Sequence, residues 1–115
     1  MNSPFTFNKR EGGTVPVYQT ALYQVKAPPV DKVKGAIKEF VRYVTESEPG
    51  TKLCTWWQEK NDPTRFVHFF IFEDEAAHSA HGQSIAIRSF EAVYSPELVG
   101  GPVIFIDYLE IAANN

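Results

Sequence analysis

The chain has 115 residues, 43% of them hydrophobic and 22% charged, and its 14 acidic and 11 basic residues give a formal net charge of -3. This composition excludes a disordered chain, and the acidic balance offers no electrostatic footprint for nucleic acid or an anionic membrane. No stretch approaches the roughly 18 apolar residues of a membrane span, the N-terminus lacks the apolar core of a signal peptide, and a single cysteine cannot form an internal disulfide. We therefore expect one compact cytoplasmic domain with no nucleic-acid or membrane partner.

The chain begins with a predicted N-terminal arm over residues 1–16, which contain prolines and paired glycines, and the folded domain is expected over 17–115. Alternating apolar residues predict a first strand over Val17–Lys26. A helix should follow, with Asp31 as its N-cap, until Pro49-Gly50 ends it. Its apolar residues recur at the spacing of one helical face, at Val33, Ile37, Phe40, Val41 and Val44.

Two further strands are predicted over Leu53–Glu59 and Phe66–Phe72, and the turn residues 61–64 between them indicate an antiparallel hairpin. The Phe66–Phe72 strand is apolar on both faces, so both faces must be covered. Asp74 should cap a short helix reaching about His81, and Ser84 a second one.

The last strand is predicted over Val103–Ile111, after Gly100-Gly101-Pro102 has ended the preceding helix. The element order β-α-β-β-α-β is typical of an α+β, ferredoxin-like fold, a four-stranded antiparallel sheet with its helices on one face. The other face would be bare and apolar, more so than a soluble monomer usually tolerates. We therefore expect a homodimer in which two sheets pack face to face.

The run after the third predicted strand has an aromatic residue, an acid two residues on, an alanine three further and a histidine four beyond that. With this spacing the chain resembles the antibiotic biosynthesis monooxygenase (ABM) family over roughly Val17–Ile111. The residues that carry the resemblance are Phe72, Asp74, Ala77 and His81, supported by Pro49-Gly50 after the first helix and Asp62-Pro63 in the hairpin turn.

The resemblance implies a dimeric α+β barrel, and the family's better-studied members oxidise polycyclic aromatics or quinols with molecular oxygen and no metal or flavin, so no cofactor is expected. Many members have a glutamate and then a tryptophan at alternate positions of the third strand, where this chain has Phe70 and Phe72. The haem-degrading relatives use an asparagine, a tryptophan and a histidine at positions that correspond to Ala21, His81 and Glu91, so haem degradation is poorly supported.

His68 and His81 are the candidate catalytic bases. His68 shares a strand face with Phe66, Phe70 and Phe72, where an imidazole could take a substrate proton or could be a hydrogen-bonded core residue. His81 matches the family's helix histidine and either lines a cavity or fixes the bend between two helices. Glu75, His78 and His81 follow one another at intervals of three residues, a spacing that could bring metal ligands together on a helix. A polar helix face exposed to solvent explains them better, so no metal is expected.

Asp107 is the third candidate catalytic residue, because it interrupts an apolar strand. It could hold His68 in the tautomer of a base, or pair with Arg65, Arg88 or a partner's lysine. The candidate substrate-binding residues are aromatic, and the two tyrosines among them are expected on central strands: Trp56, Phe70, Phe72, Tyr23 and Tyr108.

Two classes of function remain open. One is an oxidoreductase, a cofactor-independent monooxygenase acting on a small planar quinol-like or aromatic substrate, with molecular oxygen as its co-substrate. The other is a dimeric barrel that binds a small hydrophobic ligand without turnover. The loss of the strand acid favours binding alone, whereas the two histidines favour catalysis.

Overall fold

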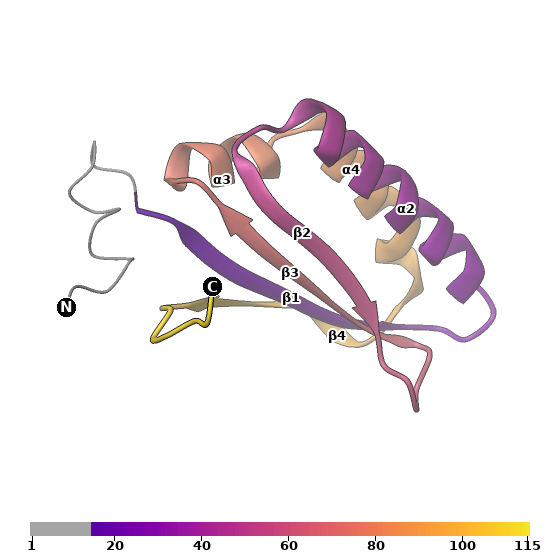
Figure 1. Ribbon diagram of the computed structural model, residues 1–115. Coiled ribbons are helices and arrows are strands. Elements are labelled where there is room, and N and C mark those ends of the chain that lie inside the picture. The colour runs from indigo at the N-terminus through magenta and orange to yellow at the C-terminus, as the bar shows by residue number, and fades with distance from the viewer. Residues whose placement is uncertain (1–14) are drawn as a thin grey trace.

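The computed structural model describes residues 15–115, and its helices lie against one face of a single sheet (Figure 1). The predicted arm therefore lies almost entirely outside the described residues. The strands are antiparallel in the order β2-β3-β1-β4, which confirms the predicted α+β, ferredoxin-like fold. The elements are β1 (Val17–Val25), α2 (Val30–Ser47), β2 (Thr51–Gln58), β3 (Arg65–Phe72), α3 (Glu75–Gly82), α4 (Ile85–Tyr94), a 3-10 turn η1 (Ser95–Glu97) and β4 (Leu98–Tyr108).

The core lies between the sheet and helices α2 and α4, which pack against each other. Side chains alternate along β3, so that Phe66, His68, Phe70 and Phe72 are buried beneath the helices while Val67, Phe69 and Ile71 face the other side. The predicted apolar face of α2 supplies the opposite wall, with Val33, Ile37, Phe40 and Val44 buried. Each such aliphatic or aromatic side chain contributes about 1.5–3 kcal/mol through its removal from water.

Side-chain caps set the start of the two short helices, as predicted. The Asp74 carboxylate accepts a hydrogen bond from the Ala77 amide at 2.9 Å, and the Ser84 hydroxyl accepts one from the Ile87 amide at 3.1 Å. The predicted Asp31 cap is wrong: α2 begins at Val30 after Pro29, with no side-chain cap. Asp31 lies instead in the first turn, where its negative charge is favourable at the positive end of the helix dipole.

The last strand differs from the prediction at both ends, because β4 spans Leu98–Tyr108 rather than Val103–Ile111. Gly100 and Gly101 do not stop the strand. They adopt positive φ angles of 77° and 109°, and the pairing with β1 shifts register nearby, between Leu22 and Gln24. The strand is therefore bent rather than broken at its glycines.

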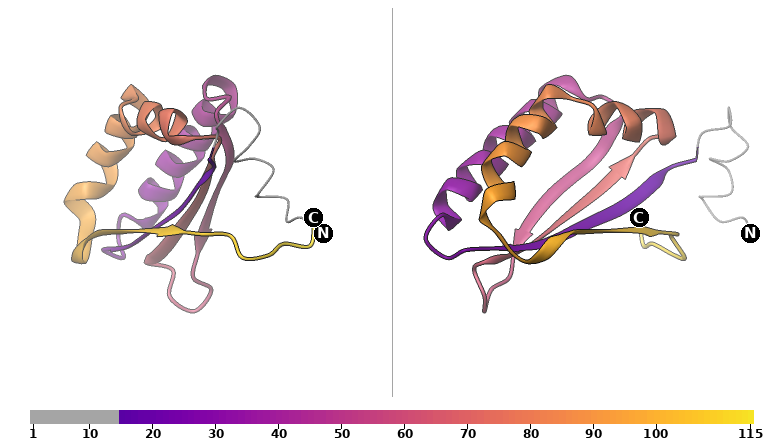
Figure 2. Two further views of the ribbon diagram at one scale, coloured as in Figure 1. Left: turned by 90° about the vertical axis from the view of Figure 1, so that its left-hand side faces the viewer. Right: turned by 180° about the vertical axis from the view of Figure 1, so that it is seen from behind.

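No described helix or strand covers the sheet face opposite the helices (Figure 2). This face carries large exposed apolar side chains. Trp57 is 65% exposed and Ile104 58% exposed, and Ile106 and Tyr108 also lie on this face. The strand order corrects the expected place of Tyr108, because β4 is an edge strand and only β1 and β3 are central. Among residues 15–115, no helix is long and apolar enough to cross a membrane.

Candidate functional site

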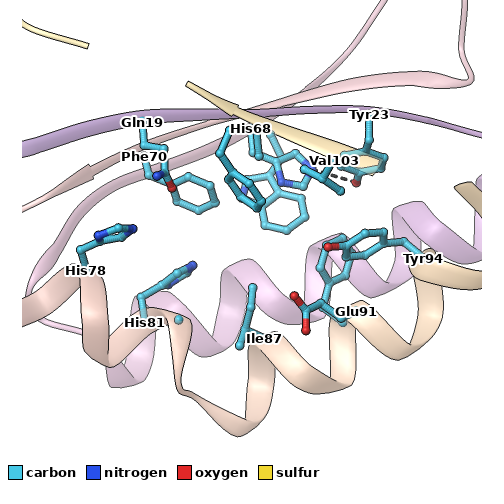
Figure 3. A pocket seen from close by; sticks show the side chains of 15 residues that line it. Gln19, Tyr23, His68, Phe70, His78, His81, Ile87, Glu91, Tyr94 and Val103 are labelled. Carbon is cyan, nitrogen blue, oxygen red and sulfur yellow. Dashed lines mark hydrogen bonds between the residues drawn. The ribbon is translucent and has the colours of Figure 1, made fainter. Parts of the chain in front are cut away.

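A cavity of about 400 Å³ lies between the sheet and helices α3 and α4 (Figure 3). Its volume lies in the range of small-molecule sites, and most of its wall is apolar and aromatic. The sheet supplies Ala21, Trp56 and Phe70, and helix α4 supplies Ile87 and Phe90. A flat, largely apolar ligand would fit such a wall.

His68 belongs to the sheet side of the cavity, and its ring stacks on Trp56 with ring centroids 3.4 Å apart. Its Nε2 atom is 2.8 Å from the Tyr23 hydroxyl, and both side chains are buried. Burial lowers the pKa of His68 well below its usual 6.5, because a charged imidazole would lose its hydration there. Burial also raises the pKa of Tyr23, so the two groups form a neutral hydrogen-bonded pair at physiological pH.

His81 reaches the cavity from α3, and Glu48, which was not among the predicted site residues, binds its ring. Its Nδ1 atom is 2.8 Å from Oε1 of Glu48, and the two side chains are only 8% and 11% exposed. Thr51 donates a hydrogen bond to the same carboxylate oxygen at 2.8 Å. When Glu48 is ionised its oxygens can only accept, so the proton of this hydrogen bond lies on Nδ1, and Nε2 of the neutral imidazole is then an acceptor. The His81 ring points into the cavity (Figure 3).

Each residue of the spaced motif has a separate structural role. Phe72 is fully buried, Asp74 caps α3, and His81 is bound to Glu48. Ala77 packs against Gly50, which has no room for a side chain, because a Cβ added to Gly50 would lie 2.6 Å from the Cβ of Ala77. The small residues let α3 approach the start of β2 closely enough for Glu48 to reach His81. Glu48 immediately precedes Pro49-Gly50, and this adjacency was the available signal for it.

Asp107 does not make the predicted contact with His68. Its carboxylate accepts a hydrogen bond from the Gln19 side-chain amide at 2.9 Å. The sheet register explains the difference, because Asp107 pairs with Gln19 across β1 whereas His68 pairs with Ala21 and Trp56. Within the described part of the chain, Asp107 also forms no ion pair with Arg65 or Arg88.

Three of the five predicted substrate-binding residues line the cavity, namely Tyr23, Trp56 and Phe70. Phe72 does not, because it lies beneath His78 and His81 with no exposed surface. Tyr108 faces the opposite side of the sheet, where its hydroxyl is 2.8 Å from that of Thr20.

Several cavity residues were not selected from the sequence as site residues for this chain, because they come together only when the sheet pairs and the helices pack. Gln19, Glu91 and Tyr94 all line the cavity. Ala21 and His81 lie on the same wall. Over residues 15–115, no group of three or more metal-ligating side chains comes together.

The fold and cavity define a small α+β, ferredoxin-like domain with a partly open cavity between its sheet and helices. The sequence profile of the family named antibiotic biosynthesis monooxygenase matches residues 16–93. The chain therefore belongs to this family. No curated protein sequence matches it closely enough to count as a relative.

Solved structures share the fold at low sequence identity. A Bacteroides thetaiotaomicron protein provisionally named an antibiotic biosynthesis monooxygenase is 16% identical, with a TM-score of 0.78 over 84% of this chain and 90% of its own. A Nitrosomonas europaea protein of the same provisional name is 18% identical, with a TM-score of 0.77 over 87% of this chain and 94% of its own. A third, from Caulobacter crescentus, is 16% identical, with a TM-score of 0.73 over 83% of this chain and 91% of its own.

Proposed function

We propose that the protein is a cofactor-independent monooxygenase that oxidises a small planar, quinol-like or aromatic substrate with molecular oxygen. The observation that carries this proposal is the Glu48–His81 pair at the wall of an aromatic cavity. Membership of the ABM family and the monooxygenase names of its structural neighbours agree with it.

The proposed chemistry begins with proton transfer from a phenolic hydroxyl of the substrate to Nε2 of His81. Glu48 holds the opposite ring nitrogen and stabilises the positive charge that the imidazole gains. The resulting phenolate is more electron-rich, and the electrons that reduce oxygen come from the substrate ring. One oxygen atom enters the product and the other leaves as water. Because no external reductant takes part, the substrate itself gives up all four electrons that the oxygen molecule accepts.

His68 is poorly suited to act as a base in this structure. Burial opposes protonation of His68, and its Nε2 is already engaged with the Tyr23 hydroxyl. His68 and Trp56 instead offer a stacked, flat surface against which an aromatic substrate can lie. We therefore propose that His68 shapes the cavity while His81 takes the proton, and we give Asp107 no direct part.

Oxygen uptake with a panel of hydroquinones and catechols tests the proposal. We expect His81→Ala to lower kcat/KM about 10²-fold or more, as loss of a general base does. Glu46→Ala is the control, because this exposed residue of α2 lies outside the cavity. Uptake that is unaffected by His81→Ala would remove the proposed base. No uptake across the whole panel would favour the alternative, a barrel that binds a small hydrophobic ligand without turnover.

We also propose that two copies of the chain pack sheet to sheet as a homodimer. The apolar face that carries Trp57, Ile104 and Ile106 supports this assembly, since a contiguous patch of this kind is usually buried in a stable protein. Ile106→Lys should give monomers in analytical ultracentrifugation, whereas Ile85→Lys, at a position 78% exposed on α4, should not. A wild-type chain that stays folded and monomeric would contradict the proposal.

A further inference from the structure

The cavity has an uneven distribution of charge. Among its lining residues, Glu91 is the only carboxylate, and the described wall includes neither lysine nor arginine. A ligand with a carboxylate or phosphate group would meet no lysine or arginine there and would be repelled by Glu91. The site is therefore suited to a neutral or positively charged ligand.

Glu91 is available for such a ligand. It lies on α4 between Ile87 and Tyr94, and its carboxylate points toward the cavity (Figure 3). No ion pair or side-chain hydrogen bond of Glu91 occurs within residues 15–115. Burial, and to a smaller extent the charge of Glu91, raises the pKa of Tyr94 to about 12, so this phenol remains a neutral donor beside the carboxylate.

Acceptors are also present elsewhere on the wall. The amide nitrogen of Gln19 donates to Asp107, and its carbonyl oxygen remains as an acceptor. When Nδ1 of a neutral His81 donates to Glu48, its Nε2 is an acceptor too. Such a cavity matches a ligand that carries hydrogen-bond donors at both ends.

Aromatic faces surround the end of the cavity near Glu91. The rings of Phe90 and Tyr94 have centroids 4.6 Å apart, and those of Tyr23 and Tyr94 5.1 Å apart. An ammonium group beside such rings gains a cation–π attraction in addition to its pairing with a carboxylate. The combination favours an amine over an uncharged group of the same size.

We propose that the cavity selects a planar phenolic ligand that carries a basic amine, with the ammonium group at Glu91 and the phenol at His81. The proposal rests on the proposed function for the placement of the phenol. Glu91 is then the residue that determines charge specificity, and it is not needed for the proton transfer itself.

Isothermal titration calorimetry under argon, where turnover cannot consume the ligand, tests this with three matched catechols. Dopamine carries the amine, ethylcatechol is neutral and dihydroxyphenylacetate is an anion. We expect dopamine to bind about fivefold more tightly than ethylcatechol, and the anion about fivefold more weakly, as one partly exposed charge contact implies. Glu91→Gln should bring all three within about twofold of one another, on the same basis. Glu46→Gln, which removes an exposed carboxylate of α2 outside the cavity, should leave the preference intact.

Equal binding of dopamine and ethylcatechol by the wild-type protein would overturn the proposal, and so would a preference that survives Glu91→Gln or a failure of all three to bind. Oxygen uptake separates this proposal from the proposed function. Uptake without charge preference would overturn the selectivity alone. Binding with the expected preference but no uptake with any catechol would support the selectivity and refute the oxygenase.

Discussion

Burial of His68 predicts that the protein loses stability as the pH falls below about 6.5. The imidazole is 3% exposed, and desolvation lowers its pKa in the folded state well below the usual 6.5. The unfolded chain takes up a proton near that value and the folded chain does not. The unfolded state therefore binds more protons, so the free energy of unfolding decreases as the pH falls.

The size of this loss in the free energy of unfolding depends only on the pKa of His68 in the unfolded chain, as long as the pH stays above the pKa of His68 in the folded protein. Above the unfolded value this histidine imposes no penalty. One pH unit below it the loss is about 1.4 kcal/mol, and two units below it about 2.7 kcal/mol. The loss stops growing once the pH falls below the folded-state pKa, where both states are protonated.

Urea unfolding of the wild-type protein and of His68→Gln, at matched protein concentration and several pH values, measures this contribution. Glutamine can still hydrogen bond to Tyr23 but does not titrate. Other groups titrate in both proteins and largely cancel in the difference between their free energies of unfolding. We expect that difference to shift by about 1.4 kcal/mol between a pH well above 6.5 and pH 5.5. A difference that stays constant with pH would refute the burial argument and show that water reaches the imidazole.

Three further predictions concern stability and are also measured by urea unfolding. Gly50→Ala should destabilise the protein by about 1–3 kcal/mol, because the new Cβ would lie 2.6 Å from that of Ala77. Adding Ala77→Gly to the Gly50→Ala variant should remove part of this destabilisation, because it removes the Cβ that the new one meets. Free-energy effects of the two substitutions that simply add would contradict this contact. Gly35→Ala, where nothing lies within 4 Å, should stabilise helix α2 by about 0.5–1 kcal/mol. Phe72→Ala should cost about 3–5 kcal/mol, and a cost below about 1 kcal/mol would mean that the position is not part of the core.

Local patterns determined most of the elements of this fold. The order of helices and strands could be predicted because its signals depend only on residues close together in the sequence. These signals are the apolar residues on both faces of β3, the helical spacing in α2, and the caps at Asp74 and Ser84. The start of β4 at Leu98 could not be predicted, because Gly100 can either break a strand or bend it. Pairing with β1 decides between these outcomes.

The candidate site depends on contacts between residues far apart in the sequence. The motif spacing pointed to His81 but gave no partner for it. The hydrogen bond between His81 and Glu48 exists only because α3 packs onto the start of β2. Register likewise placed Asp107 beside Gln19 and away from His68. Periodicity in a sequence reports which face a side chain occupies, whereas strand order and helix packing decide which side chains meet. The sequence by itself therefore determined the architecture and several of the aromatic residues that line the cavity. Only the tertiary structure decided that the ring of His81, at the cavity wall, is hydrogen-bonded to the carboxylate of Glu48.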